Sequence, residues 1–238
     1  MKKIVLISLF FCFSMQFIVA QTETGVWTSL SIDKRIKKWQ FSADTDIRTY
    51  GGDNVYYFGL IDRWSIGVNA KYQIIKPLEV SLNYLIMNKL DTKYANYQWR
   101  HRVIPTIQAK QKWGDLQFSL RERIQFTTKD DSKRIRPDGS IDHYAVNSEF
   151  IWRNRFQIQY DIPQSKVNPA VSVESFYELN NPKGNQFQTI RYTLAFNYQV
   201  NKQNSVEIFN HFDYQPNDLS IEKYGIYILG ISYRYSLK

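Results

Sequence analysis

The sequence predicts an all-β protein, an antiparallel up-and-down transmembrane β-barrel of 10–12 strands that follows a cleaved signal peptide. Three observations carry this prediction. Apolar or aromatic residues alternate with polar ones in segment after segment, most clearly over 190–198 and 227–235. Successive side chains of a strand point to opposite faces, so each segment has one apolar and one polar face. The N-terminus also has the composition of a secretion signal, and tight connections alternate with longer ones.

The signal peptide is predicted for residues 1–20 and the barrel for residues 21–238. A basic start at Lys2 and Lys3 and an apolar run over 4–19 precede a small residue, after which cleavage is expected. The run is shorter than the roughly 20 residues of a spanning helix, which argues against an uncleaved anchor. The only cysteine of the sequence lies in this segment, so the mature chain offers no disulfide, thiolate metal site or cysteine nucleophile.

Eleven candidate strands follow from the alternation. They are expected near 24–33, 39–48, 57–73, 78–87, 98–110, 116–126, 145–160, 169–179, 188–200, 205–214 and 224–237. Bacterial single-chain barrels have even strand numbers, so either the first segment is not a wall strand or one strand is hidden. The longer connections are rich in Gly, Pro, Asn and Asp, and such barrels place long loops outside and short turns in the periplasm.

Composition favours the membrane-embedded form of such a barrel over a soluble β-sandwich or a lipocalin-like barrel. The chain has 17 Tyr, 15 Phe and 6 Trp, and Tyr and Trp favour the membrane–water boundary. The formal charge of +9 falls to +7 without the two lysines of the signal. A basic chain can bind nucleic acid, but an exported protein without a groove-reading motif points instead to anionic lipid or anionic solutes.

The polar faces of the strands carry the candidate functional residues. Arg or Lys facing lipid at mid-membrane costs roughly 2–4 kcal/mol, so these faces are expected to line the lumen. The expected lumen-lining residues are Arg48, Arg63, Arg100, Arg102, Arg121, Arg123, Arg153, Arg155, Arg191, Arg234, Asp44, Asp46, Glu79, Glu174, Glu178 and Glu207.

Two interpretations of this arginine-rich lining compete. Arginine forks can bond carboxylates across a narrow interior and fill it, or they can line an anion-preferring pore or ligand site. Six arginines, in pairs on three successive candidate strands, are expected to form one basic wall that needs anions. We expect protein carboxylates across the lumen to supply them and to plug the barrel, because 10–12 strands leave little spare bore.

Catalysis finds little support in the sequence. His211 shares a strand face with Glu207 and Asp213, but no serine is obviously placed beside it. No catalytic residue, metal ligand set or cofactor site is predicted, and enzymatic activity is left open with a leaning against it. A membrane-embedded hydrolase of lipid or peptide, and a subunit of a surface or secretion complex, remain as alternatives.

Four short motifs resemble a family of exported proteins, the domain-of-unknown-function family 2490. They are Val26-Trp27, Trp99-Arg-His-Arg102, Leu120-Arg-Glu-Arg-Ile124 and Trp152-Arg-Asn-Arg155. The resemblance covers most of the mature chain and implies an outer-membrane β-barrel of unassigned activity. It supplies no catalytic residues.

The sequence as a whole therefore predicts a porin-like, monomeric barrel in the outer membrane of a Gram-negative cell. Its expected role is structural or in the passage of small solutes, including anions. Its expected partners are outer-membrane lipid and, during biogenesis, the barrel-assembly machinery, with no nucleic acid.

Overall fold

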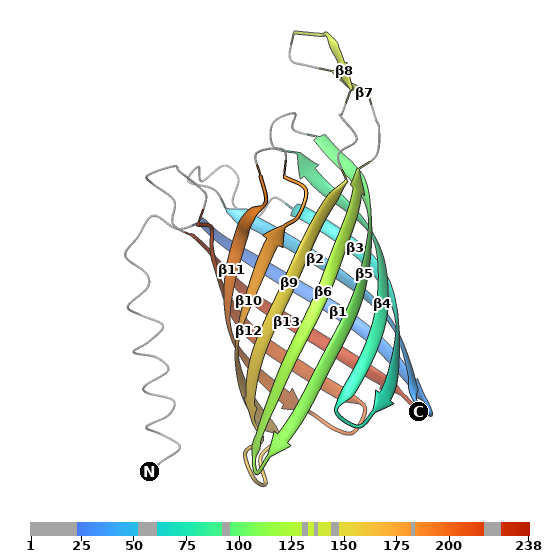
Figure 1. Cartoon of the computed structure of the whole chain (residues 1–238), viewed down its shortest axis with the longest axis vertical. Helices are drawn as coiled ribbons and strands as arrows, with labels where there is room; N and C mark the ends of the chain where they lie inside the picture. The colour runs from blue at the N-terminus through green and yellow to red at the C-terminus, as the bar shows by residue number, and fades with distance from the viewer. Residues whose placement is uncertain are drawn as a thin grey trace.

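The chain folds into a closed β-barrel (Figure 1). The computed structural model describes residues 23–51, 61–91, 96–129, 133–135, 138–143, 148–181, 184–216 and 225–238. The predicted signal peptide at 1–20 and its cleavage point lie outside these ranges. Within them no helix is long and apolar enough to cross a membrane.

Thirteen strands are present in the described part of the chain. They are β1 (Glu23–Ile36), β2 (Trp39–Gly51), β3 (Ile61–Ile75), β4 (Leu78–Asp91), β5 (Asn96–Trp113), β6 (Leu116–Lys129), β7 (Lys133–Ile135), β8 (Ile141–His143), β9 (Glu149–Tyr160), β10 (Val167–Glu178), β11 (Gln186–Gln199), β12 (Asn204–Tyr214) and β13 (Gly225–Leu237).

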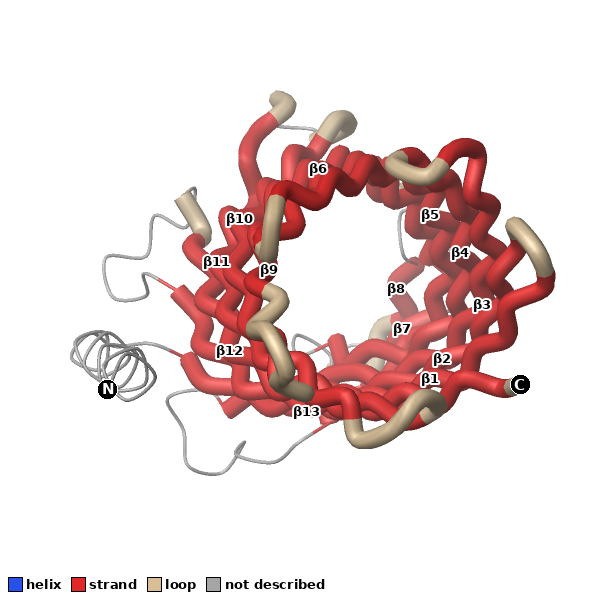
Figure 2. Tube along the Cα trace, turned by 90° about the horizontal axis from the view of Figure 1, so that it is seen from below, coloured by secondary structure: helices blue, strands red, loops and turns tan. Residues whose placement is uncertain are grey.

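Eleven of these strands form the barrel wall, in the order β1-β13-β12-β11-β10-β9-β6-β5-β4-β3-β2 (Figure 2). The short strands β7 and β8 pair only with each other, in the connection between β6 and β9. The sequence analysis missed this hairpin because segments of three residues are too short to show alternation.

The all-β barrel is confirmed, but the fully antiparallel arrangement is wrong at one place. Each wall strand runs antiparallel to the next along the chain, whereas β1 pairs with β13 in parallel, with Trp27 opposite Gly230. An odd number of alternating strands leaves the first and the last pointing the same way, so the closing pair must be parallel. The segment predicted at 24–33 is therefore a wall strand, and the count is odd rather than even.

Alternation along each strand separates an outer apolar face from an inner polar one. On β1 the outward Val26, Leu30 and Ile32 are 48%, 53% and 51% exposed, while the inward Asp33 is 6% exposed. The connections at the lower end in Figure 1 are mostly shorter than those at the upper end. The barrel thus presents apolar side chains outside and a polar lining inside.

Candidate functional site

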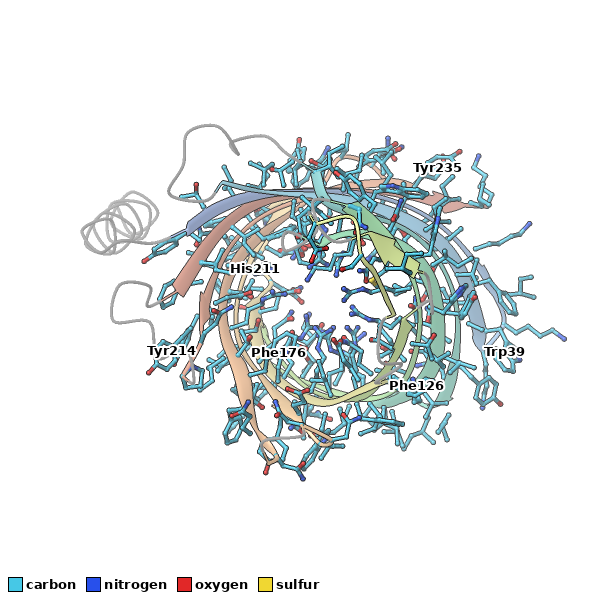
Figure 3. The ribbon with its side chains drawn as sticks, turned by 90° about the horizontal axis from the view of Figure 1, so that it is seen from above. Trp39, Phe126, Phe176, His211, Tyr214 and Tyr235 are labelled. Carbon is cyan, nitrogen blue, oxygen red and sulfur yellow. The ribbon has the colours of Figure 1, made fainter. Side chains whose placement is uncertain are left out.

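The interior of the barrel holds a cavity of about 830 Å³, here called the large cavity. Its lining runs from Asp62 and Glu149, near the long connections, to Lys71 and Gln108, near the short turns. The expectation of a filled interior is therefore not met in the described part of the chain. Figure 3 shows the barrel from above, along its length. Phe176 and His211 lie inside the wall, and Trp39, Tyr214 and Tyr235 lie outside it.

A second cavity of about 210 Å³, here called the side niche, adjoins the large cavity. The two share Trp27, Arg123, Arg153 and Arg191 in their linings, so they are contiguous. The niche lies against the inner faces of β6 and β9–β12, where Ala170 and Ala195 leave space. Small side chains at these inward positions are the reason that the niche exists.

Basic side chains outnumber acidic ones in these linings. Across both cavities, twelve basic side chains face seven carboxylates. The basic set is Arg48, Arg63, Lys71, Lys89, Arg100, Arg102, Arg121, Arg123, Arg153, Arg155, Arg191 and Arg234, and the acidic set is Asp44, Asp46, Asp62, Glu149, Glu174, Glu207 and Asp213.

Fourteen of the sixteen residues predicted to line the lumen belong to these two sets. Glu79 and Glu178 do not line either cavity. Glu79 lies nearer the short turns, where its carboxylate pairs with the ammonium groups of Lys71 at 3.2 Å and Lys110 at 2.9 Å. Glu178 lies near the long connections and accepts a hydrogen bond from Asn181 at 2.9 Å.

Strands β5, β6 and β9 are neighbours and bring three arginine pairs onto one stretch of wall. The register places Arg121 opposite Arg155 and Arg123 opposite Arg153, so like charges face each other directly across the β6–β9 pair. Arg102 on β5 lies opposite Thr127 and donates from Nε to its hydroxyl at 2.9 Å. Opposed like charges are destabilising unless anions intervene.

One carboxylate serves this wall most directly. Glu174 on β10 is 4% exposed, and its Oε1 accepts from Arg121 Nη2 at 2.8 Å and from Arg153 Nη2 at 3.0 Å. The Arg153 guanidinium also lies 4.2 Å from the centre of the Phe176 ring. The sequence analysis expected Glu174 to act from across the lumen, but it lies on the strand next to β9, opposite Arg155.

Five residues at one level of the barrel form what we call the charge row: Arg121, Arg155, Glu174, Arg191 and Asp213. They lie directly opposite one another on the successive strands β6, β9, β10, β11 and β12. Arg191 donates from Nε and Nη2 to the two carboxylate oxygens of Asp213, both at 2.6 Å. The row is basic–basic at its β6 end and alternates in sign from β9 to β12.

A second charged group lies on β2 and β3, which also line the large cavity. Asp46 on β2 pairs with Arg48 Nε at 3.1 Å and with Arg63 Nη2 at 3.6 Å. Its other oxygen accepts from Ser65 Oγ at 2.5 Å. As at Glu174, one carboxylate pairs with two guanidinium groups.

Trp27 is a cavity residue that the sequence analysis used only for the family resemblance. Its ring lies 3.2 Å from the guanidinium carbon of Arg48 and packs edge-on against Phe209 at 5.5 Å. Phe209 in turn lies over Gly230, where an added Cβ would come within 2.0 Å of the ring. The signal for Trp27 was available, because the outward Val26 and Leu30 fix the inward face of β1 by alternation.

The imidazole of His211 also lines the side niche, but its contacts do not form a hydrolytic triad. Its Nδ1 is 2.7 Å from the hydroxyl of Thr193, and its ring packs 4.4 Å from that of Phe209. Asp213, the acid two residues on, is bonded bidentately to Arg191. No group of three or more His, Cys, Asp or Glu is placed to hold a metal ion in the described ranges.

Comparisons with known proteins identify the family of this chain. The model of a family described as a protein of unknown function, DUF2490, matches residues 24–219. No curated protein is similar enough in sequence to count as a relative. Among solved structures, a NanC porin in a rhombohedral crystal form has 12% sequence identity and a TM-score of 0.47, covering 80% of this chain and 85% of that one.

Proposed function

We propose that this chain, which belongs to the family of proteins of unknown function DUF2490, is an outer-membrane β-barrel. Small anionic solutes pass through its cavity. The observation that carries this proposal is the lining of the interior: a cavity of about 830 Å³ whose basic side chains outnumber its carboxylates. Rings of arginine and lysine favour anions in pores.

The outer face supports the placement in a membrane. Ile66, Leu82 and Leu229 lie on three different strands and are 56%, 55% and 57% exposed. Soluble monomers rarely expose apolar patches beyond a few hundred Å². A belt of such side chains around a barrel fits contact with lipid hydrocarbon.

Aromatic side chains at two levels support the same placement. Trp39 packs on Tyr72 at 4.8 Å beside a short turn, and Trp64 packs edge-on against Trp99 at 5.2 Å near the long connections. Two girdles of aromatic residues mark the two membrane–water boundaries of outer-membrane barrels.

The location is tested by N-terminal sequencing of the mature protein and by membrane fractionation. We expect the mature chain to begin at Gln21 and to fractionate with outer membranes. Recovery of the full-length protein in the soluble fraction after gentle lysis would contradict the membrane placement.

Solute passage is tested by swelling of liposomes that contain the refolded chain. Gluconate, glucose and glucosamine are similar in size and differ in charge. We expect gluconate to enter fastest and glucosamine slowest, and the Arg121→Gln, Arg123→Gln double variant to narrow this difference. The matched control is Lys76→Gln with Lys202→Gln, which removes the same charge from exposed turns. Absence of swelling would favour the structural role instead.

A further inference from the structure

Several residues that line the side niche carry buried hydrogen-bond donors without a partner. Nε of Arg121, Nε of Arg123, Nε of Arg155 and Nε1 of Trp27 are buried in the structure without a hydrogen-bond partner. All four residues line the niche. Buried polar groups are paired in the great majority of cases, so four unpaired donors on residues that line one cavity favour a ligand rich in acceptors.

The charges around the niche are also incomplete. Glu174 pairs with Arg121 and Arg153, and Asp213 pairs with Arg191. Among the described residues, no carboxylate lies within salt-bridge distance of Arg123 or Arg155. Two guanidinium groups without an ion pair therefore lie next to each other, since Arg123 and Arg155 are on paired strands, one diagonal step apart. The niche also holds Glu174 and Glu207, so its lining has five arginines and two carboxylates.

The chemistry of the donors defines the class of ligand. Arginine and tryptophan side chains donate hydrogen bonds and accept none, so they select a group made of acceptors only. Two adjacent guanidinium forks fit an oxyanion bidentately and match about two negative charges, which a phosphate group carries near neutral pH. A neutral solute with hydroxyl groups would not neutralise the positive charge of the two guanidinium groups.

We propose that the side niche is a binding site for a dianionic phosphate group, held by Arg123 and Arg155 and completed by donors from Arg121 and Trp27. The niche of about 210 Å³ is smaller than the roughly 300–1,000 Å³ of sites for drug-sized ligands. It therefore holds the phosphate group itself, while any remainder of a larger solute extends into the adjoining large cavity. The proposal rests on the proposed function, because a solute must enter the barrel to reach the side niche.

The site is tested by isothermal titration calorimetry on the full mature chain refolded in detergent, with inorganic phosphate, sulfate and chloride as probes. We expect phosphate and sulfate to bind more tightly than chloride. In the Arg123→Gln, Arg155→Gln double variant, phosphate affinity falls about tenfold or more, because charge-assisted hydrogen bonds are lost. The control is Arg100→Gln with Arg102→Gln, which removes two arginines of the large cavity outside the niche.

Two further variants keep the test decisive if the double variant does not fold. Arg123→Lys with Arg155→Lys retains the charge and removes the bidentate fork, and Trp27→Phe retains the ring and removes the N–H. We expect both to weaken phosphate binding. Glycerol phosphate, compared with glycerol, separates a site for the free ion from one that accepts phosphate esters.

Equal losses in the niche and control variants, or no heat of binding with phosphate, would overturn the proposal. Because the calorimetry requires no conduction, its outcome is distinguishable from that of the swelling experiment. Anion-preferring swelling without phosphate binding would leave the proposed function intact and remove the site.

Discussion

At one end of the charge row each charge faces an opposite charge, whereas at the other end two positive charges face each other. From β10 to β12 the row alternates in sign, and Arg191 is bonded to both oxygens of Asp213. Between β6 and β9 it sets Arg121 directly opposite Arg155, with Glu174 on the next strand as their nearest carboxylate in the row. The same barrel level thus contains one closed ion pair and one open cluster.

This difference indicates what each region does. A bidentate Arg–Asp pair satisfies its own charges, so it fixes two strands together and leaves little for a solute. A cluster of guanidinium groups that shares one carboxylate keeps a positive potential in the cavity. Under the proposed function, the β11–β12 pair has a structural role and the β6–β9 pair attracts the solute.

Reversing a charge should have opposite effects in the two regions, and the largest effect is expected at Arg191. Arg191→Glu removes the two hydrogen bonds that the Asp213 carboxylate accepts from the guanidinium and places a third carboxylate beside it and Glu174. We expect a loss of about 3–5 kcal/mol in the free energy of unfolding, because buried Asp213 loses its ion pair and gains a like charge beside it. A urea titration of the chain folded in lipid vesicles measures this. A loss below that of the Glu174→Gln variant would contradict the comparison.

Removing the shared carboxylate should have the next largest effect. Glu174→Gln keeps one acceptor oxygen for Arg121 and Arg153 but loses the charge, so we expect a cost of about 1.5–3 kcal/mol in the same titration. The matched control is Glu178→Gln on the same strand, whose carboxylate accepts from Asn181. If both variants lost the same stability, Glu174 would have no special part in the cluster.

The sign of the effect should change within the basic wall. Arg123→Glu puts a carboxylate opposite Arg153 in place of a like charge, so we expect the free energy of unfolding to rise by about 0.2–1 kcal/mol. The same variant should lose phosphate binding in the niche. A loss of stability as large as that of Arg191→Glu would show that Arg123 makes stabilising contacts in the folded protein, and would contradict the expected gain.

The smallest effect is expected at the exposed ends of the strands. Lys112 donates to Asp161 at 2.8 Å and lowers the pKa of that carboxyl below its ordinary value, with a further hydrogen bond from Gln159. This contribution to stability is present above the pKa of the unfolded state and is lost as the pH falls through the folded pKa. In an NMR titration, Lys112→Gln should raise the pKa of Asp161, and Lys76→Gln should leave it unchanged.

Much of the wall could be predicted from alternation alone. The first and the tenth expected strands, at 24–33 and 205–214, correspond to β1 and β12 within a few residues. Alternation is a local property, because each side chain is fixed to one face by its own backbone. The same rule placed fourteen of the expected residues in the linings of the interior cavities.

Barrel closure, strand register and the space in the niche depend on contacts between strands, which alternation within one strand does not predict. The parallel closure between β1 and β13 follows from the parity of the whole strand count, which is a global property. The position of Glu174 beside β9 rather than across the cavity depends on register between neighbours. The space in the niche depends on small inward residues such as Ala170 and Ala195 meeting on paired strands, which no single segment reveals.

The most direct test of the account is the reversal potential of single channels in a planar bilayer under a potassium chloride gradient. We expect a potential that reports anion preference for the unmodified chain, and a shift toward zero for the Arg121→Gln, Arg123→Gln double variant. We expect no such shift for Lys76→Gln with Lys202→Gln. An insulating barrel, or a cation preference that the double variant leaves unchanged, would contradict the claim that the open basic cluster draws anions into the cavity.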